Sequence, residues 1–311
     1  MITVLSMNPC IDLTLTIPGL TIGGSHRAHG VRQDVSGKAV NVAYALKNLD
    51  IPCEVLGFDF IENGSLLKEA LDDAKISYDL VPTVGSIRTN VKIFEEAKQR
   101  MTEINQEGAI VTKEALSLLL EKVINVKTDV LILSGSLPLG IDHKVYGEII
   151  RQVKVPVILD AYGLVLAHGV EAGPYIIKPN ISEMEQAFGL SLPTRESQLA
   201  AGQDLLRRHK KLRALCLSLG EEGALMIGRE EAFFAPVLDI PVRGVQGAGD
   251  SLVAGLAMEI AKTPDAPLDV LLKSAVAIAA ASLIREGSQM ATKEGFAEML
   301  EKVEIVQVYG K

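Results

Sequence analysis

Short apolar runs alternate with segments of helical character along most of this chain, and no other feature constrains its fold so strongly. The runs are rich in Val, Ile and Leu, which suits parallel strands buried on both faces of a sheet. The expected strands are Ile2–Leu5, Cys53–Gly57, Tyr78–Val81, Val130–Leu133, Val155–Leu159, Tyr175–Ile177 and Ala214–Ser218. The expected helices are Asn41–Leu49, Ser65–Ala74, Lys113–Val123, His143–Arg151, Ile181–Phe188 and Gln198–Arg208. This alternation predicts an α/β fold, a doubly wound and mostly parallel sheet flanked by helices.

Residues 10–35 and 87–107 interrupt the alternation with short runs that have no helical period. Runs such as Leu13–Ile17 predict a small antiparallel β-sheet that stands off the main body. Such a sheet is either a lid over a cleft or a plain surface hairpin. Because 48% of the 311 residues are hydrophobic, we expect one large core and a single domain over residues 1–311 that carries these segments.

Charge and cysteine content argue against several classes of protein. The formal net charge is −8, which disfavours nucleic acid and anionic membrane surfaces as partners. Cys10, Cys53 and Cys216 form no CxxC pair, so neither a disulfide framework nor a zinc site is expected. The sequence contains neither a long apolar run nor a start typical of a signal peptide, and we expect a cytoplasmic location.

Residues 247–251 read Gly-Ala-Gly-Asp-Ser and precede an alanine-rich segment that we expect to be helical. Glycine lets backbone N–H groups turn toward a ligand, and a helix N-terminus favours an anion. Asp250 then belongs to an active site, or it simply caps the helix, because aspartate is a common N-cap.

Two further loops carry polar groups at the start of predicted helices. In residues 36–39, Gly37 permits close approach of a ligand and Lys38 offers a cation, although a surface turn with a solvated lysine also fits. In the KPNISE segment, Asn180 and Glu183 lie three residues apart on one helix face. They form either a capping pair or an oxygen-rich site for Mg²⁺ and its waters.

Two turns follow predicted strands, SGSLPLG at residues 134–140 and SLGEEGA at residues 218–224. In an open α/β sheet, ligands bind beyond the carboxyl ends of the strands. Ser136 is therefore positioned for a substrate hydroxyl, and Gly220 and Gly223 for a nucleotide. Simple turns explain both segments equally well.

The order of these motifs resembles that of the ribokinase/PfkB family of sugar kinases. The motifs are SGKAVNVA near residue 40, SGSLPLG near 135, KPNISE near 180, SLGEEGA near 220 and VQGAGDSLVAG near 250. Together they cover nearly the whole chain. The start SMNPCIDLT and the SGSLPLG turn resemble the branch that contains 1-phosphofructokinase and tagatose-6-phosphate kinase.

The resemblance implies ATP as donor, Mg²⁺ as metal and a β-lid over the active site. It also implies roles for individual residues. Asp250 matches the catalytic base, and the anion hole corresponds to Gly247, Ala248 and Gly249. Asn180 and Glu183 match residues that hold magnesium through water. The nucleotide contacts correspond to Lys178, Ser218, Gly220 and Gly223.

On the acceptor side, the resemblance implies sugar contacts from Asp12, Gly37, Lys38 and Asn41, beside Ser136. Arg88, with help from Arg27 and Lys38, would bind a phosphate of the acceptor. A homodimer through the lid is also implied, with Leu13, Leu15 and Ile93 available to pair.

Four residues depart from the family pattern. Ser36 and Ala39 stand where the loop usually has glycine, Tyr162 where the branch has a small hydroxyl residue, and Leu139 where lysine is common. These changes concern the acceptor, and none touches the proposed base.

The implied reaction is phosphorylation of a ketose phosphate by ATP, with fructose 1-phosphate as the first choice of acceptor. Tagatose 6-phosphate is the alternative in the same branch. A kinase for an unphosphorylated sugar or nucleoside, and a non-enzymatic sugar-phosphate or nucleotide sensor, are the other candidates.

Overall fold

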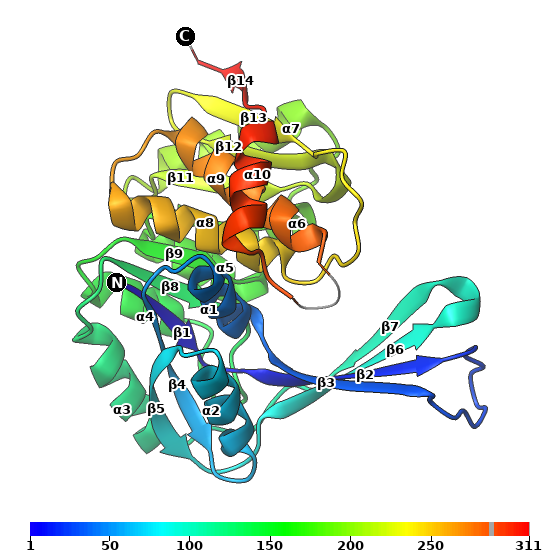
Figure 1. The fold of residues 1–311 in the computed structure, drawn as a ribbon. Helices are drawn as coiled ribbons and strands as arrows, with labels where there is room; N and C mark the ends of the chain where they lie inside the picture. The colour runs from blue at the N-terminus through cyan, green and yellow to red at the C-terminus, as the bar shows by residue number, and fades with distance from the viewer. Residues whose placement is uncertain (286–288, 311) are drawn as a thin grey trace.

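The apolar runs form a ten-stranded central sheet in the computed structural model, which describes residues 1–285 and 289–310 (Figure 1). The strand order is β14-β13-β12-β11-β10-β9-β8-β1-β4-β5. The bounds are β1 Ile2–Ser6, β4 Cys53–Phe60, β5 Ser77–Thr83, β8 Val130–Ser134, β9 Val157–Asp160, β10 Ile176–Ile177, β11 Ala214–Ser218, β12 Gly223–Ile227, β13 Ala232–Pro236 and β14 Val306–Tyr309. Neighbours from β5 across to β11 pair in parallel, and the pairs from β11 to β14 are antiparallel. The predicted mostly parallel sheet is confirmed.

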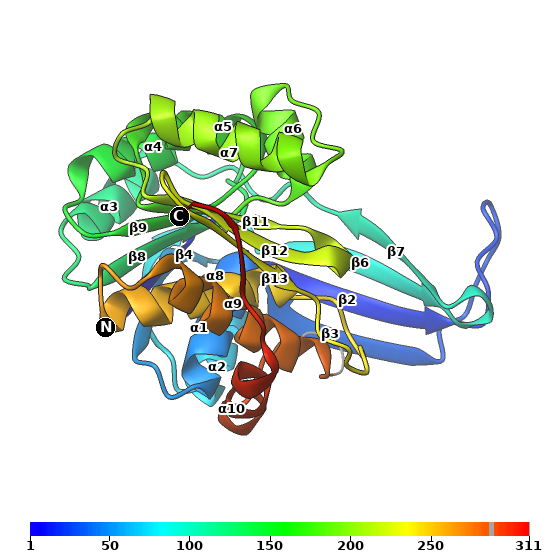
Figure 2. The same ribbon diagram turned by 90° about the horizontal axis from the view of Figure 1, so that it is seen from above.

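Helices cover both faces of this sheet, as the doubly wound prediction requires (Figure 2). One layer holds α1 Lys38–Asn48, α2 Gly64–Asp73, α8 Ala248–Lys262, α9 Leu268–Leu283 and α10 Lys293–Lys302. The other layer holds α3 Lys113–Ile124, α4 Val145–Gln152, α5 Gly163–Ala172, α6 Ile181–Phe188 and α7 Arg195–Arg208. Within the described ranges, none of these helices is long and apolar enough to cross a membrane.

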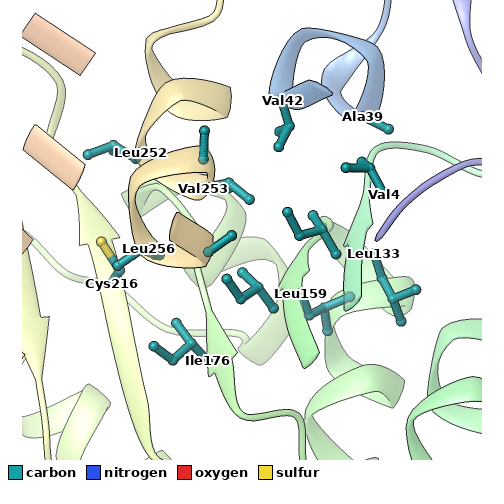
Figure 3. Packing of buried hydrophobic residues seen from close by; sticks show 14 of the residues in the cluster. Val4, Ala39, Val42, Leu133, Leu159, Ile176, Cys216, Leu252, Val253 and Leu256 are labelled. Carbon is teal, nitrogen blue, oxygen red and sulfur yellow. The ribbon is translucent and has the colours of Figure 1, made fainter. Parts of the chain in front are cut away.

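The core between the sheet and the α1–α8 layer consists of aliphatic side chains (Figure 3). Val4, Leu133 and Leu159 from three parallel strands are fully buried beside Val42 and Val253 from the two helices. Helix α8 is buried on nearly all sides because α9 packs closely behind it. This packing fixes the position and direction of the α8 N-terminus, where the Gly-Ala-Gly-Asp motif lies.

The two interrupting segments form a separate four-stranded sheet, the lid, which extends away from the body (Figure 1). Its strands are β2 Cys10–Ile17, β3 Gly30–Ser36, β6 Arg88–Glu95 and β7 Arg100–Asn105, in the order β3-β2-β6-β7. The expectation of an antiparallel sheet is wrong for the central pair, because β2 and β6 run parallel. Both strands leave the body at the carboxyl edge of the main sheet, so they start at the same end of the lid.

The carboxyl ends of the parallel strands bring polar residues to one edge of the main sheet. Ser134 ends β8, Asp160 ends β9, Lys178 follows β10 and Ser218 ends β11. The lid and the start of α8 lie at this same edge (Figure 1). This edge is where an open α/β sheet binds its ligands.

Candidate active site

Gly247, and not Asp250, occupies the N-cap of α8. Gly247 has φ 77°, a left-handed conformation that glycine adopts readily, and the helix begins at Ala248. The interpretation of Asp250 as an N-cap is therefore wrong. Asp250 lies in the first helical turn, 6% exposed, and its carboxylate accepts a hydrogen bond of 2.8 Å from Asn41 Nδ2.

The surroundings of Asp250 favour its protonated form more than water does. Burial, and then the negative charge of Asp160, raise the pKa of Asp250 to about 6. The hydrogen bond from Asn41 and the charges of Lys38 and Lys178 act in the opposite direction. A carboxyl group whose pKa lies near 6 is ionised at neutral pH and is basic enough to accept a proton.

Ser36, one of the departures from the family pattern, supports this arrangement. Its buried hydroxyl donates a hydrogen bond of 3.3 Å to Asn41 Oδ1. The Asn41 side chain is thus held at both ends, by Ser36 and by Asp250. The substitution of glycine by serine at this position orients the asparagine that contacts the proposed base.

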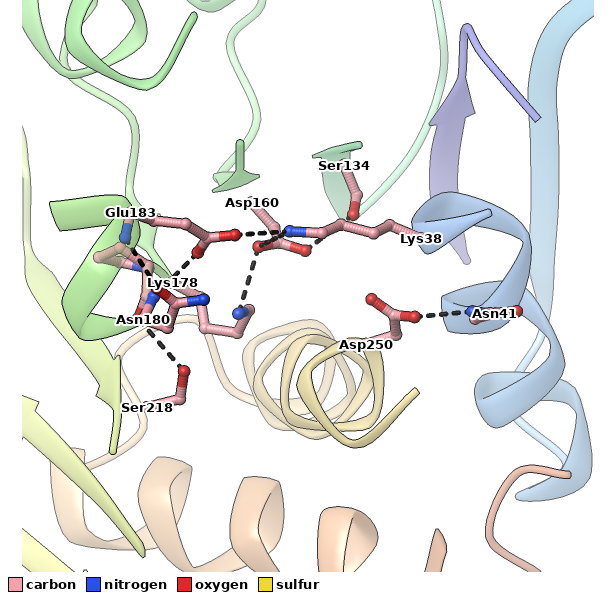
Figure 4. Close-up of polar contacts among 10 residues, drawn as sticks. Lys38, Asn41, Ser134, Asp160, Lys178, Asn180, Glu183, Ser218 and Asp250 are labelled. Atoms are coloured by element: carbon pink, nitrogen blue, oxygen red, sulfur yellow. Dashed lines mark hydrogen bonds and ion pairs between the residues drawn. The ribbon is translucent and has the colours of Figure 1, made fainter. Parts of the chain in front are cut away.

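Asp160 is a central residue of the site that the sequence analysis did not select. Its side chain is fully buried, and its Oδ1 atom lies 3.3 Å from Lys38 Nζ and 3.2 Å from Lys178 Nζ (Figure 4). Ser134 Oγ donates a hydrogen bond of 3.0 Å to the other oxygen. Burial raises the pKa of Asp160, but the charges of Lys178 and Lys38 outweigh burial and hold the pKa below its usual value. Asp160 therefore stays ionised and fixes two lysines in place.

Lys38 extends from α1 toward Glu183 at the start of α6 (Figure 4). Besides Asp160, its Nζ atom contacts Glu183 Oε1 at 3.1 Å. Burial lowers the pKa of Lys38, yet the neighbouring carboxylates raise it above its usual value, so this lysine remains protonated.

Asn180 and Glu183 form a complete capping box at the start of α6. Asn180 Oδ1 accepts from the backbone N–H of Glu183 at 2.7 Å, and Glu183 Oε2 accepts from the backbone N–H of Asn180 at 2.9 Å. The capping interpretation is confirmed. The second oxygen of Glu183 lies beside Lys38 and is directed into the site.

Two cavities meet at the start of α8. One, of about 400 Å³, lies between the body and the lid and is lined by all but one of the residues expected to contact the acceptor. The other, of about 470 Å³, contains all of the expected nucleotide contacts. Lys38, Gly247 and Asp250 line both cavities. We call them the acceptor cavity and the nucleotide cavity.

The acceptor cavity contains six of the expected contacts, Asp12, Gly37, Lys38, Asn41, Arg88 and Ser136. Arg27 is the exception, because it lies in the exposed connection between β2 and β3 and does not line the cavity. Asn90 and Lys92 line it although the sequence analysis did not select them. The sequence could have indicated both residues, because they lie two and four positions after Arg88 on one predicted strand and such residues share a face.

The nucleotide cavity contains Lys178, Asn180, Glu183, Ser218, Gly220, Gly223, Gly247, Ala248 and Gly249. Apart from Lys38 and Asp250, its remaining wall is apolar and includes Val237, Leu238 and Val276. This combination of polar groups and an apolar wall suits a ligand with a charged part and an apolar part.

Of the other departures from the family pattern, Ala39 and Tyr162 line the acceptor cavity, whereas Leu139 is 41% exposed and does not.

A larger hollow of about 1290 Å³ lies at the opposite edge of the sheet, and none of the expected site residues lines it. Two cations in that hollow, Arg213 and Arg229, donate to backbone carbonyls of neighbouring loops. These hydrogen bonds hold the neighbouring loops together. The expected site residues instead line the two cavities around the start of α8.

Known proteins share both the sequence pattern and the fold. The family model described as pfkB family carbohydrate kinase matches residues 4–294. The 1-phosphofructokinase of Rhodobacter capsulatus is 32% identical over 261 residues, which cover 82% of each chain. That of Bacillus subtilis is 28% identical over 312 residues, 99% of this chain and 100% of the relative. The structure of phosphofructokinase-2 from Escherichia coli, 22% identical, has the same fold, with a TM-score of 0.90 over 97% of this chain and 98% of that one. The chain belongs to the pfkB family of carbohydrate kinases, enzymes that transfer a phosphoryl group from ATP to a sugar.

Proposed function

We propose that this kinase phosphorylates a ketose phosphate, most directly fructose 1-phosphate to fructose 1,6-bisphosphate. The observation that carries the proposal is the meeting of the acceptor and nucleotide cavities at Asp250. A donor phosphate in one cavity and an acceptor hydroxyl in the other would face the same carboxylate. Two relatives that cover most of the chain are named 1-phosphofructokinase, which selects the acceptor.

Arg88 supports a phosphorylated acceptor over a neutral one. Its guanidinium group donates to Asn8 O, Asn90 Oδ1 and Gln106 O, and no carboxylate pairs with it in the described part of the chain. A cation without a carboxylate partner that lines the acceptor cavity is suited to bind a phosphate. A kinase for a neutral sugar or a nucleoside would not need this charge.

The chemical step assigns a distinct task to each group at the start of α8. Asp250 accepts the proton of the acceptor hydroxyl while the hydroxyl oxygen forms a bond to the γ-phosphorus of ATP. The bond between that phosphorus and the β–γ bridging oxygen breaks, and ADP leaves with the electron pair. Backbone N–H groups of residues 247–249 would stabilise the charge that develops on the phosphoryl oxygens, assisted by the partial positive charge of the helix N-terminus.

Lys38 is suited to bind the phosphoryl group as it moves between the cavities. It lines both of them and is held by Asp160 and Glu183. Asp160 thereby acts as a positioning residue for Lys38 and also for Lys178, which lies in the nucleotide cavity.

The residues around Glu183 fit Mg²⁺ only if the ion arrives with the nucleotide and keeps its waters. No group of three His, Cys, Asp or Glu side chains that could hold a metal occurs in residues 1–285 and 289–310. Mg²⁺ commonly binds through one or two carboxylates, water and substrate phosphates. Glu183 and Asn180 would hold such waters, and the ion would offset charge on the β- and γ-phosphates.

We also infer that the lid mediates a homodimer. Residues of the lid that alternate with those lining the acceptor cavity form an apolar outer face, made of Leu13, Leu15, Val31, Val91, Ile93 and Ile104. Val31 on edge strand β3 is 68% exposed and Ile104 on the other edge strand, β7, is 59% exposed, and each continues a row of apolar side chains across the sheet, a surface that is costly to leave in water. A second lid packed against this face would cover both side chains.

The three cysteines are free and buried, which suits a protein located in the reducing cytoplasm.

Steady-state kinetics with ATP and four acceptors test the proposed function. We expect the highest kcat/KM for fructose 1-phosphate, compared with fructose, fructose 6-phosphate and tagatose 6-phosphate. A higher value for tagatose 6-phosphate would select the alternative in the same branch. Equal or higher values for fructose would refute a phosphorylated acceptor, and binding without turnover of any acceptor would indicate a sensor.

A further inference from the structure

Lys92 lies on the lid face that closes the acceptor cavity, and it is buried there although it is a lysine. Its side chain is 9% exposed, and its Nζ atom contacts Asp12 Oδ2 at 2.7 Å. Placing a lysine and an aspartate out of water is costly unless each finds its partner. Nothing in the chemical step described above uses Lys92, so its position calls for another role.

Lys92 is one end of a continuous chain of polar contacts across the lid. Asn90 Nδ2 donates to Asp12 Oδ1 at 3.0 Å, and Arg88 Nη1 donates to Asn90 Oδ1 at 3.1 Å. Arg88, Asn90 and Lys92 alternate along β6 and all line the acceptor cavity. The chain therefore links the expected phosphate-binding arginine to the expected sugar-binding aspartate.

Lys92 also sets the charge of this face. Burial raises the pKa of Asp12, but the hydrogen bond and the charge of Lys92 outweigh burial and hold the pKa below its usual value. Glu103, opposite Lys92 on β7, is a second carboxylate that lines the cavity. With Lys92 present, the positive charges of Arg88 and Lys92 balance the negative charges of Asp12 and Glu103 on this face. Without Lys92, Arg88 alone faces both carboxylates. A doubly charged acceptor phosphate would then be repelled.

We propose that Lys92 is a specificity-determining residue, which neutralises and orients Asp12 so that the lid face admits a phosphorylated acceptor. This inference rests on the proposed function, since it assumes that the acceptor carries a phosphate. It concerns the charge of the acceptor and not the identity of the sugar.

The test is the KM for fructose 1-phosphate and for ATP in Lys92→Met, with Lys92→Arg to restore the charge. We expect Lys92→Met to raise the KM for the acceptor about tenfold or more, the size of effect that loss of a charge-assisted contact produces. The KM for ATP should change less than about twofold, because the nucleotide cavity does not include Lys92. Lys92→Arg should recover most of the acceptor affinity.

Lys98→Met is the matched control, because Lys98 pairs with Glu95 in the same lid and does not line the cavity. It should leave both KM values unchanged. A folded Lys92→Met with an unchanged acceptor KM, or with equal rises in both KM values, would overturn the inference. If Lys92→Met does not fold, a folded Lys92→Arg with a strongly raised acceptor KM overturns it equally. Should the wild-type kinase prefer tagatose 6-phosphate, the proposed acceptor fails and the Lys92 comparison is made with that sugar.

Discussion

Asp250 and Asp160 are two buried carboxylates in one site whose surroundings shift their pKa values in opposite directions. Asp160 contacts two lysines and a serine and remains ionised. Asp250 has one amide partner and feels the negative charge of Asp160, so its pKa rises to about 6. A pair of groups separated in this way indicates which one exchanges protons during the reaction. This criterion selects Asp250, in agreement with the base that we propose.

The pH dependence of kcat/KM should reflect the pKa of Asp250. A general base must be deprotonated, so activity should fall about tenfold per pH unit as the pH drops below about 6. Asn41→Ala separates this effect from titration of the substrate phosphate. The amide of Asn41 stabilises the ionised carboxylate, so its removal should move the acid limb to higher pH. A limb that stays in place would show that another group titrates.

At the scale of elements, the lid strands divide their side chains between two tasks. Residues that alternate along β2 and β6 place polar groups toward the acceptor cavity and apolar groups on the opposite face. A shift in register by one residue would exchange these faces, so strand pairing in the lid determines which side chains line the acceptor cavity and which form the apolar outer face.

Leu15→Asp should convert the proposed dimer to a monomer, as measured by sedimentation or light scattering. The charge would fall in the centre of the apolar outer face of the lid, between Val31 and Ile93. Val308→Asp is the control, because Val308 is a half-exposed apolar residue on β14, in the main sheet and not in the lid. A wild-type protein that is monomeric, or a Leu15→Asp variant that remains dimeric, would contradict the lid interface.

Element types were largely predictable from the sequence because burial patterns are local. The run Val130–Leu133 reads as a buried strand without reference to any other segment, and β8 is that strand extended by Ser134. Parallel pairing of β2 with β6 was not predictable, because it depends on where both segments leave the body. The capping box at Asn180 was predictable, since it spans only four residues.

At the scale of the whole molecule, the site is assembled from segments that are distant in the sequence. Lys38 and Asp160 are 122 residues apart, and Asn41 and Asp250 are 209 apart. This separation in the sequence explains why Asp160 was not predicted as a site residue. Its contacts form only when the fold brings Lys38 of α1 and Lys178, which follows β10, to the end of β9. The motif order identified the family, and the fold was needed to show which charges neutralise one another.

The main sheet and the lid have separate tasks in the resulting account. In the proposed mechanism, groups of the main sheet and α8 hold the donor and provide the base, and groups of the lid help to select the acceptor. Substitutions of lid residues that line the acceptor cavity should therefore alter the acceptor KM, and substitutions at the start of α8 should alter kcat.

The central claim is that Asp250 is the base, and the most direct measurement is the kcat of Asp250→Asn with ATP and fructose 1-phosphate. We expect kcat to fall about 10²- to 10⁴-fold while ATP binding changes little. The surface variant Asp204→Asn serves as control, since Asp204 forms ion pairs with the neighbouring Arg207 and Arg208 on α7, away from both cavities. Asp250→Asn should also be at least as stable as the wild type at pH 8, because a carboxyl group with a raised pKa is ionised there at a cost that disappears as the pH falls below 6. A folded Asp250→Asn enzyme that turns over near the wild-type rate would contradict the account.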